Sequence, residues 1–257
     1  MQRNFLSVFL GILAFAALVV PAVTRAADQP PGPLSEVWVV TPKEGQSAQM
    51  FEGLKAQLAM RRDAGDPWTW QVYTPVLGDA LSRVVIRTCC FQWADLDSYE
   101  KWNKDHEALQ KQFSESVAPH LQSAAHYLEE MDWANSHWNQ EAGPYRYFAI
   151  TEWALKPGHE ALFNEARSKA SQIAINQGWG GTEHSWLWGS RIGGSPRAFL
   201  VVPHRNYADM QPKGESFMEF LGEKMGSEEA ARALMQDLSG STSGSEFQIW
   251  ELQDLGN

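Results

Sequence analysis

The chain repeats itself at a nearly constant spacing, and this feature constrains its fold more than any other. Three blocks of the first half recur in the second half in the same order, offset by between 112 and 116 residues. The matched blocks are residues 43–45 with 156–158, residues 70–78 with 186–194, and residues 83–86 with 197–200. Ordered matches at one offset are typical of a duplicated structural unit. We therefore expect two copies of one module.

The first copy, residues 35–132, predicts the order strand, helix, strand, strand, helix, strand. Residues 46–64 carry apolar side chains at Met50, Phe51, Leu54 and Leu58, which is helical spacing. Asp97 and Glu100 are spaced as a capping box that would open the second helix, expected to end near residue 117. The expected strands are residues 36–41, 69–76, 83–91 and 125–131.

The second copy, residues 145–254, predicts the same order. Its expected strands are residues 147–154, 183–190, 197–202 and 246–252, and its expected helices are residues 159–176 and 215–238. The second of these helices is expected to be interrupted near Gly226. Residues 133–144 between the copies are polar and end in Gly-Pro, which indicates a linker.

This element order is the ferredoxin-like pattern. With about 110 residues per copy, a Lys-x-Gly turn before the first helix and Trp-rich strands, the chain resembles the dimeric α+β barrel superfamily. That superfamily includes antibiotic-biosynthesis monooxygenase-like and NIPSNAP-like proteins. The resemblance implies an α+β fold in which two tandem ferredoxin-like repeats pack their antiparallel sheets into one pseudo-dimeric barrel. A barrel of this kind would need no second chain to close.

The beginning of the chain predicts a secretory signal peptide at residues 1–26. Arg3 precedes a 16-residue apolar run, residues 5–20, and small residues follow Pro21 up to Ala26. The run is shorter than the roughly 20 residues that a spanning helix needs. We therefore expect cleavage after Ala26, or else after Ala27, and a periplasmic or secreted protein without a membrane anchor after cleavage.

The charge of the expected mature protein argues against two classes of partner. Removing residues 1–26 leaves 19 basic and 31 acidic side chains, a net charge of -12. Nucleic acids and anionic membranes need clustered cations, so we expect neither as a partner. The twelve tryptophans occur in both halves, as core residues or as the lining of an aromatic pocket. A homo-oligomer of pseudo-dimeric chains is compatible with these features.

Cys89 and Cys90 are the two cysteines of the chain, and they are adjacent. Neighbouring cysteines can pair only through a strained ring, and the C-x-x-C spacing of redox pairs is absent. We therefore expect ordinary strand residues here, with a disulfide between the two as the less favoured alternative.

Strand alternation divides the third strand of each copy into two sets of side chains. One set is apolar and is expected to face the helices: Val84, Ile86 and Thr88, matched by Ala198, Leu200 and Val202. The other set is expected to face the space between the sheets: Arg83, Val85, Arg87 and Cys89, matched by Arg197, Phe199, Val201 and Pro203. Arg87 lies mid-strand, where a charge needs a partner such as Glu152 or a ligand.

We expect one ligand site per chain, because a fused pair can keep one site and lose the other. The candidate ligand-binding residues are Arg87, Trp153, His184, Trp186 and Trp188. If they face the barrel interior, they suit a planar or aromatic anionic ligand; if the tryptophans face the helices, they are core residues. The glycine-rich residues 178–181 are expected to act as a flap. Neutral divergence without a site in either copy is the alternative.

The chain contains seven histidines, but no pair has the spacing of a known metal motif, so no metal is expected. Some haem-binding members of the resembled superfamily use a histidine near the helix that contains His106. Residues 104–107 match no such motif, so no cofactor is expected, with haem as the less favoured alternative. Nucleophile elbow, phosphate loop and nicotinamide fingerprint are also absent from the sequence.

No catalytic set is identified, and three functions remain open. The favoured one is an exported module that binds a small hydrophobic or aromatic ligand. The second is a cofactor-independent monooxygenase-like enzyme, with His184 or Arg87 as its polar group. The third is a structural or interaction protein with a filled barrel.

Overall fold

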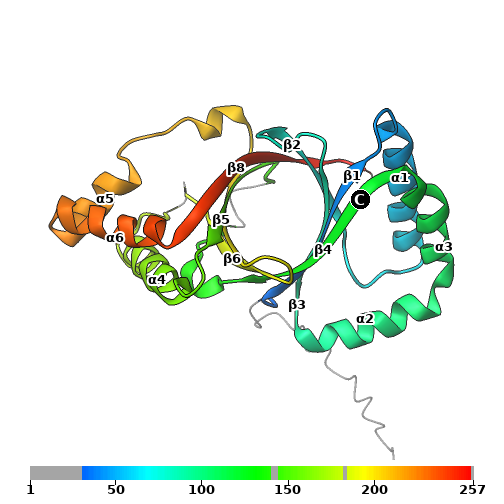
Figure 1. Cartoon of the computed structure of the whole chain (residues 1–257), viewed down its shortest axis with the longest axis horizontal. Coiled ribbons are helices and arrows are strands. Elements are labelled where there is room, and N and C mark those ends of the chain that lie inside the picture. The colour runs from blue at the N-terminus through cyan, green and yellow to red at the C-terminus, as the bar shows by residue number, and fades with distance from the viewer. Residues whose placement is uncertain (1–30, 140–143, 182–183, 256–257) are drawn as a thin grey trace, which may run out of the picture. The chain divides into compact units, whose positions relative to one another are not determined.

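The computed structural model describes residues 31–139, 144–181 and 184–255, so the expected signal peptide lies outside the described residues. Residues 31–255 contain one closed, eight-stranded antiparallel barrel with helices on two opposite sides (Figure 1). The strands are β1 Leu34–Pro42, β2 Gln71–Leu77, β3 Val84–Phe91, β4 Leu121–Met131, β5 Tyr147–Leu155, β6 Leu187–Ile192, β7 Arg197–His204 and β8 Thr242–Gln253. The helices are α1 Ser47–Asp63, α2 Trp93–Asp105, α3 Glu107–Ser116, α4 Glu160–Asn176, α5 Phe217–Met225 and α6 Glu228–Gly240.

The barrel consists of two ferredoxin-like half-sheets, which confirms the duplicated α+β fold. The strand order is β4-β1-β3-β2 in the first copy and β8-β5-β7-β6 in the second. Two antiparallel seams join the halves: β2 pairs with β8, and β4 pairs with β6. The pair of Val72 with Gln253 belongs to the first seam, and the pair of Glu129 with Arg191 belongs to the second.

Two hydrophobic cores lie between the barrel wall and its helices. Met50 and Leu54 of α1 pack against Val84 and Ile86 of β3, and the corresponding core of the second copy contains Phe163 of α4. Each such side chain contributes roughly 1.5–3 kcal/mol when it is fully buried. The set predicted to face the helices, which includes Val84, Ile86, Ala198 and Leu200, does so. The alternation of side chains along each strand therefore predicted the correct faces of β3 and β7.

The second helix of the first copy differs from its prediction at both its beginning and its middle. It begins at Trp93, and its capping box is formed by Gln92 and Asp95, not by Asp97 and Glu100. It divides at His106, whose backbone leaves the helical region (φ -124°, ψ 49°), so α2 and α3 are separate. In the second copy the expected interruption is confirmed: Gly226, with φ 66°, ends α5 in the left-handed conformation.

The segment expected as a linker contributes to the barrel wall in its described part, residues 133–139 and 144. Trp133 Nε1 donates a hydrogen bond of 3.2 Å to the carbonyl oxygen of Gly32, at the beginning of the first copy. Trp186 Nε1 donates one of 2.8 Å to the carbonyl oxygen of Asn135. These contacts attach the segment to both copies. Within the described residues, no helix has the length and apolar character that a membrane crossing requires.

Candidate functional site

The barrel encloses a cavity of about 630 Å³. All eight strands contribute to its wall, so both copies build one shared space. The volume lies within the range of about 300–1,000 Å³ that small-molecule sites occupy. The alternative of a filled barrel is therefore wrong.

The two ends of this cavity differ in chemistry. At the end where β5 and β6 terminate and β3 and β7 begin, the wall carries charged residues; we call this the charged end, formed by Arg83, Glu152, Arg191 and Glu246. At the opposite end the wall carries Pro31, Cys89, Cys90, Trp133, Trp138 and Tyr145, and we call this the aromatic end. An elongated occupant would therefore meet a polar and an apolar environment in one cavity.

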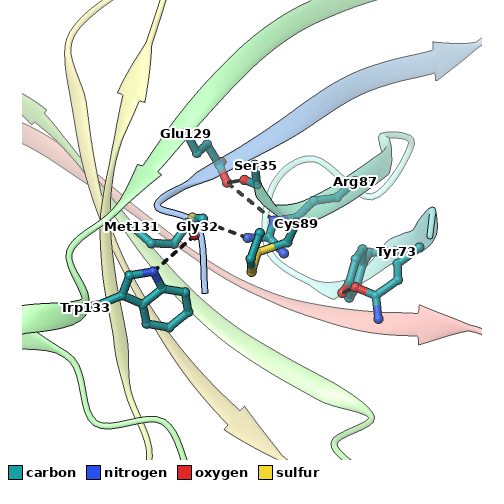
Figure 2. The surroundings of a disulfide bond; sticks show 10 residues. Gly32, Ser35, Tyr73, Arg87, Cys89, Glu129, Met131 and Trp133 are labelled. Atoms are coloured by element: carbon teal, nitrogen blue, oxygen red, sulfur yellow. Dashed lines mark hydrogen bonds and ion pairs between the residues drawn. A yellow bond between two sulfur atoms is a disulfide. The ribbon is translucent and has the colours of Figure 1, made fainter. Parts of the chain in front are cut away.

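Arg87 lies between these ends and faces the cavity, as expected from its place on β3. Its Nε lies 3.6 Å from Glu129 Oε2, and its Nη2 lies 3.7 Å from the sulfur atom of Met131 (Figure 2). Ser35 Oγ donates a 3.1 Å hydrogen bond to the same oxygen of Glu129. The guanidinium thus has one distant ion pair and one weak sulfur contact, which leaves donors available to an occupant.

The expected partner of Arg87, Glu152, is the wrong one. Glu152 lies on β5, where Arg191 Nη2 forms an ion pair with it and Arg197 Nε is 3.6 Å away. Arg87 instead reaches Glu129 on β4, because only one strand, β1, lies between β3 and β4. Burial raises the pKa of Glu152, although Arg191 and Arg197 act to lower it. This carboxyl therefore takes up a proton more readily than an ordinary glutamate.

Tyr73 of β2 places a phenol hydroxyl in the same wall. The hydroxyl donates a 2.9 Å hydrogen bond to Gln71 Oε1, and the ring meets Phe148 edge to face at 5.3 Å. Burial raises the pKa of Tyr73, although Arg87 acts to lower it. The phenol therefore stays protonated at neutral pH and serves as a hydrogen-bond donor.

Cys89 and Cys90 form a disulfide with each other, so the expectation of ordinary strand cysteines is wrong. The peptide bond between them is cis. In a regular strand two successive side chains point to opposite faces, but here both cysteines line the cavity. Figure 2 shows the disulfide on the strand that carries Arg87, near Met131 and Trp133.

Four of the five predicted ligand-binding residues do not line the barrel cavity. Trp153 stacks on Trp188 with ring centroids 5.4 Å apart, and Trp186 and Trp188 are buried in the core beneath α4. His184 stacks on Trp179 at 4.5 Å, on the outside of the barrel. The alternative of core tryptophans matches this packing, and of the five only Arg87 reaches the cavity.

The glycine-rich loop also lies away from the cavity. Gly178 and Trp179 border a shallow outer pocket together with His184 and Phe220. Trp179 packs against Phe220 of α5 with ring centroids 4.9 Å apart. The described part of the loop, residues 178–181, therefore does not border the barrel cavity, and the flap expectation does not hold for it.

Sequence reasoning missed most of the cavity wall. Strand alternation could have found Glu246, Gln248, Trp250 and Leu252, which share one face of β8. Trp133 and Trp138 carried no such signal, because they belong to the segment interpreted as a linker.

The cavity wall does not fit a haem held through a histidine. Each of the seven histidines falls within the described residues, and none lines the cavity. His106 instead stacks on Trp102 at 4.2 Å, on the helical side of the sheet. The described residues also contain no group of three His, Cys, Asp or Glu side chains arranged to hold a metal ion. The wall offers tyrosine oxygens but neither an imidazole nor a free thiol as an iron ligand.

Comparison with known proteins supports the fold. No family model and no curated protein sequence matches the chain. A candidate monooxygenase from Lactobacillus acidophilus NCFM aligns with a TM-score of 0.51 and 9% identity, over 86% of this chain and 94% of that protein. A candidate monooxygenase from Fusobacterium nucleatum aligns with a TM-score of 0.51 and 10% identity, over 87% and 94%. At such identity the likeness shows the dimeric α+β barrel fold and does not select NIPSNAP-like or any other single family.

Proposed function

We propose that the chain binds a small aromatic molecule with a weakly acidic group inside the barrel. The position of Arg87 carries this proposal: its guanidinium faces a largely apolar cavity with a single ion pair, at 3.6 Å. A guanidinium has five N–H donors and binds a carboxylate through two parallel hydrogen bonds. An acidic ligand group would use donors that the protein leaves free.

The aromatic part of the ligand has a matching environment. Tyr73, Phe148, Trp133 and Trp250 line the cavity and offer ring faces and edges. Aromatic pairs in offset or edge-to-face geometry add about 0.5–1.5 kcal/mol beyond the burial of their area. The Tyr73 hydroxyl near Arg87 already donates its one proton to Gln71, so it can accept a hydrogen bond from the occupant, which favours a ring that bears a donor over a plain hydrocarbon.

The binding test compares Arg87→Gln and Arg87→Lys with the wild type, using tryptophan fluorescence titrated with aromatic carboxylic acids and phenols. Hydrogen bonds to a charged group are worth about 1.5–3 kcal/mol, so Arg87→Gln should weaken binding roughly ten- to hundredfold. Arg87→Lys keeps the charge and should lose less. The control is Arg232→Gln on α6, which removes an equal charge from an exposed ion pair. Equal affinities for Arg87→Gln and the control would refute the proposal.

A second candidate function is cofactor-independent oxygenation, and the pairing of Glu129 with Arg87 favours it. Glu129 can accept a proton from an acidic ligand, and Arg87 can hold the anion that results. Oxidation of an activated methylene group by O₂ to a carbonyl releases the second oxygen atom as water, so it balances without a reductant. The likeness to two candidate monooxygenases supports this candidate at the level of fold.

Oxygen consumption separates the two candidates. An enzyme should consume one O₂ per bound phenol or activated methylene compound, and Glu129→Gln should abolish turnover while binding persists. If the wild-type protein binds these compounds but consumes no oxygen, the result supports the binding function and excludes oxygenation of the compounds tested.

We also propose that the protein is exported, on the layout of residues 1–26 described above. The charged start, the 16-residue apolar run and the small residues before Ala27 support this. Amino-terminal sequencing of the protein isolated from a periplasmic extract should begin at Ala27. A full-length chain confined to the cytoplasmic fraction would contradict export.

A further inference from the structure

We propose that the disulfide between Cys89 and Cys90 is a reactive site that exchanges with small thiols entering the barrel cavity. This activity goes beyond ligand binding and does not depend on the proposed function, because the thiol needs no aromatic ring and no acidic group. Three features support it: both cysteines line the cavity, a β-bulge holds them there, and a charged pair lies at the same level of the wall.

The two cysteines border the space that a small molecule would enter. Both are half-buried, and both line the cavity at its aromatic end. Cys89 follows Val85 and Arg87 on the inward face of β3, and the disulfide keeps the sulfur of Cys90 beside that of Cys89. Thiol–disulfide exchange requires access to a sulfur atom. A cavity of about 630 Å³ gives a small thiol that access.

A β-bulge in β3 turns Cys90 inward. β1 has register partners for Cys89 and Phe91 but none for Cys90. This extra residue shifts the alternation by one, so Phe91 stacks on Trp68 at 4.4 Å on the helical side, while Cys90 shares the inward face with Cys89. The backbone N–H of Gly32 donates a 3.2 Å hydrogen bond to the carbonyl oxygen of Cys90. The bulge is therefore attached to the segment before β1.

A charged pair lies at the level of the disulfide. Cys89, Ser35 and Glu129 form one row across β3, β1 and β4, because Ser35 is in register with both of the others. Arg87 starts two residues before Cys89, about 7 Å along the strand. Its guanidinium nevertheless contacts Glu129 and Met131, so the side chain leans toward the row of Cys89 (Figure 2). A thiolate at the disulfide would therefore meet both a positive and a negative charge.

The exchange balances with the thiol as its only co-reactant. A thiol gives its proton to water, and its sulfur attacks Cys89 Sγ, which is the disulfide sulfur on the strand face of Arg87. The new S–S bond forms as the Sγ–Sγ bond breaks, and Cys90 leaves as a thiolate that takes up a proton. A second thiol then attacks the mixed disulfide. Two small thiols become one disulfide, and their two electrons leave the protein with two thiols; a small-molecule disulfide reverses both steps.

The charges predict opposite effects on the rate, because the attacking and the leaving groups are both thiolates. Arg87 attracts them, and Glu129 repels them. Arg87→Gln should therefore slow reduction of the folded protein, and Glu129→Gln should accelerate it. Each change should be roughly three- to eightfold, the effect of one unit charge about 7 Å away at an effective dielectric constant of about 40–80.

The test measures how fast excess 2-mercaptoethanol reduces the folded protein. Samples are stopped with N-ethylmaleimide and read by intact mass, since reduction of the disulfide exposes two thiols for labelling. The matched control is Arg83→Gln, which removes an equal charge from the cavity wall six residues before Cys89, about 20 Å along the strand. This variant should change the rate less than about twofold. In urea-unfolded protein Glu129→Gln should have no effect, because residue 129 is then 40 positions from Cys89 without a fixed contact.

Three results would overturn the proposal. Equal rates in wild type, Arg87→Gln and Glu129→Gln would show that the charged pair does not act on the disulfide. Faster reduction in both variants would indicate loosened packing in place of a charge effect. Reduction that occurs only after unfolding in urea would show that small thiols do not reach the sulfur atoms. None of these results bears on the binding of aromatic acids, so the proposed function is tested separately.

Discussion

Gly189 on β6 gives a direct test of how tightly the cavity wall is packed. It is in register with Phe199 of β7, whose ring lies over the position that a side chain at residue 189 would occupy. A Cβ atom there would be 2.2 Å from Phe199 Cζ and 3.0 Å from the carbonyl oxygen of Glu130. Gly189→Ala must therefore displace the Phe199 ring.

Overpacking of this kind costs typically about 1–3 kcal/mol of the free energy of unfolding. The displaced atoms belong to a side chain, so the cost depends on Phe199. In a Phe199→Leu background the ring is gone, and Gly189→Ala should cost less than about 0.5 kcal/mol. The expected coupling energy is at least about 1 kcal/mol, well above what independent sites show.

Urea denaturation of the wild type, both single variants and the double variant, followed by tryptophan fluorescence, measures this coupling. A second readout is ligand affinity, because Phe199 lines the cavity and its displaced ring would occupy ligand space. Additive losses of stability in the four proteins would show that the ring does not respond to residue 189, and the packing argument would be wrong.

Three further outcomes follow from other positions. Gly53→Ala places a Cβ atom 2.1 Å from the backbone oxygen of Ser116, which cannot rotate away, so urea stability should fall despite the gain of up to about 1 kcal/mol in helix propensity. Burial lowers the pKa of His204 below 6.5, so its contribution to stability is present above pH 6.5 and is lost as the pH falls; His204→Asn should flatten that decline in a urea series. Cys89 and Cys90 should resist alkylation in unfolded, unreduced protein and take up two labels after reduction, by intact mass; labelling without reductant would contradict the disulfide.

Much of the fold could be predicted because the same sequence blocks occur twice in the same order. The interior and exterior faces of β3 and β7 followed from alternation alone, since each set of side chains is consistent in both copies. Helix details were less accessible. The break at His106 depends on its backbone conformation and on its stacking against Trp102, neither of which has a local signature in the sequence.

The site was harder to predict because it depends on which strands are neighbours. Arg87 was placed correctly, since its face follows from its own strand, but its partner Glu129 follows from the order β4-β1-β3. Trp186 and Trp188 illustrate the same limit. The sequence placed both in an expected strand at residues 183–190 and could not show which face they occupy, and the observed strand begins at Leu187. The disulfide was missed because the two side chains of a regular strand diverge.

The last described strand determines when a binding site can exist at all. β8 fills the gap between β2 and β5, and its pairing joins Gln253 to Val72, which is 181 positions earlier in the chain. Contacts between such distant residues form slowly because closing a long loop costs entropy, and the cavity is complete only once β8 has docked. A chain that stops before Thr242 would leave β2 and β5 as open sheet edges, which pair readily with other molecules. Ligand binding would then distinguish chains in which β8 has closed the barrel from chains that lack it, and the latter would tend to aggregate.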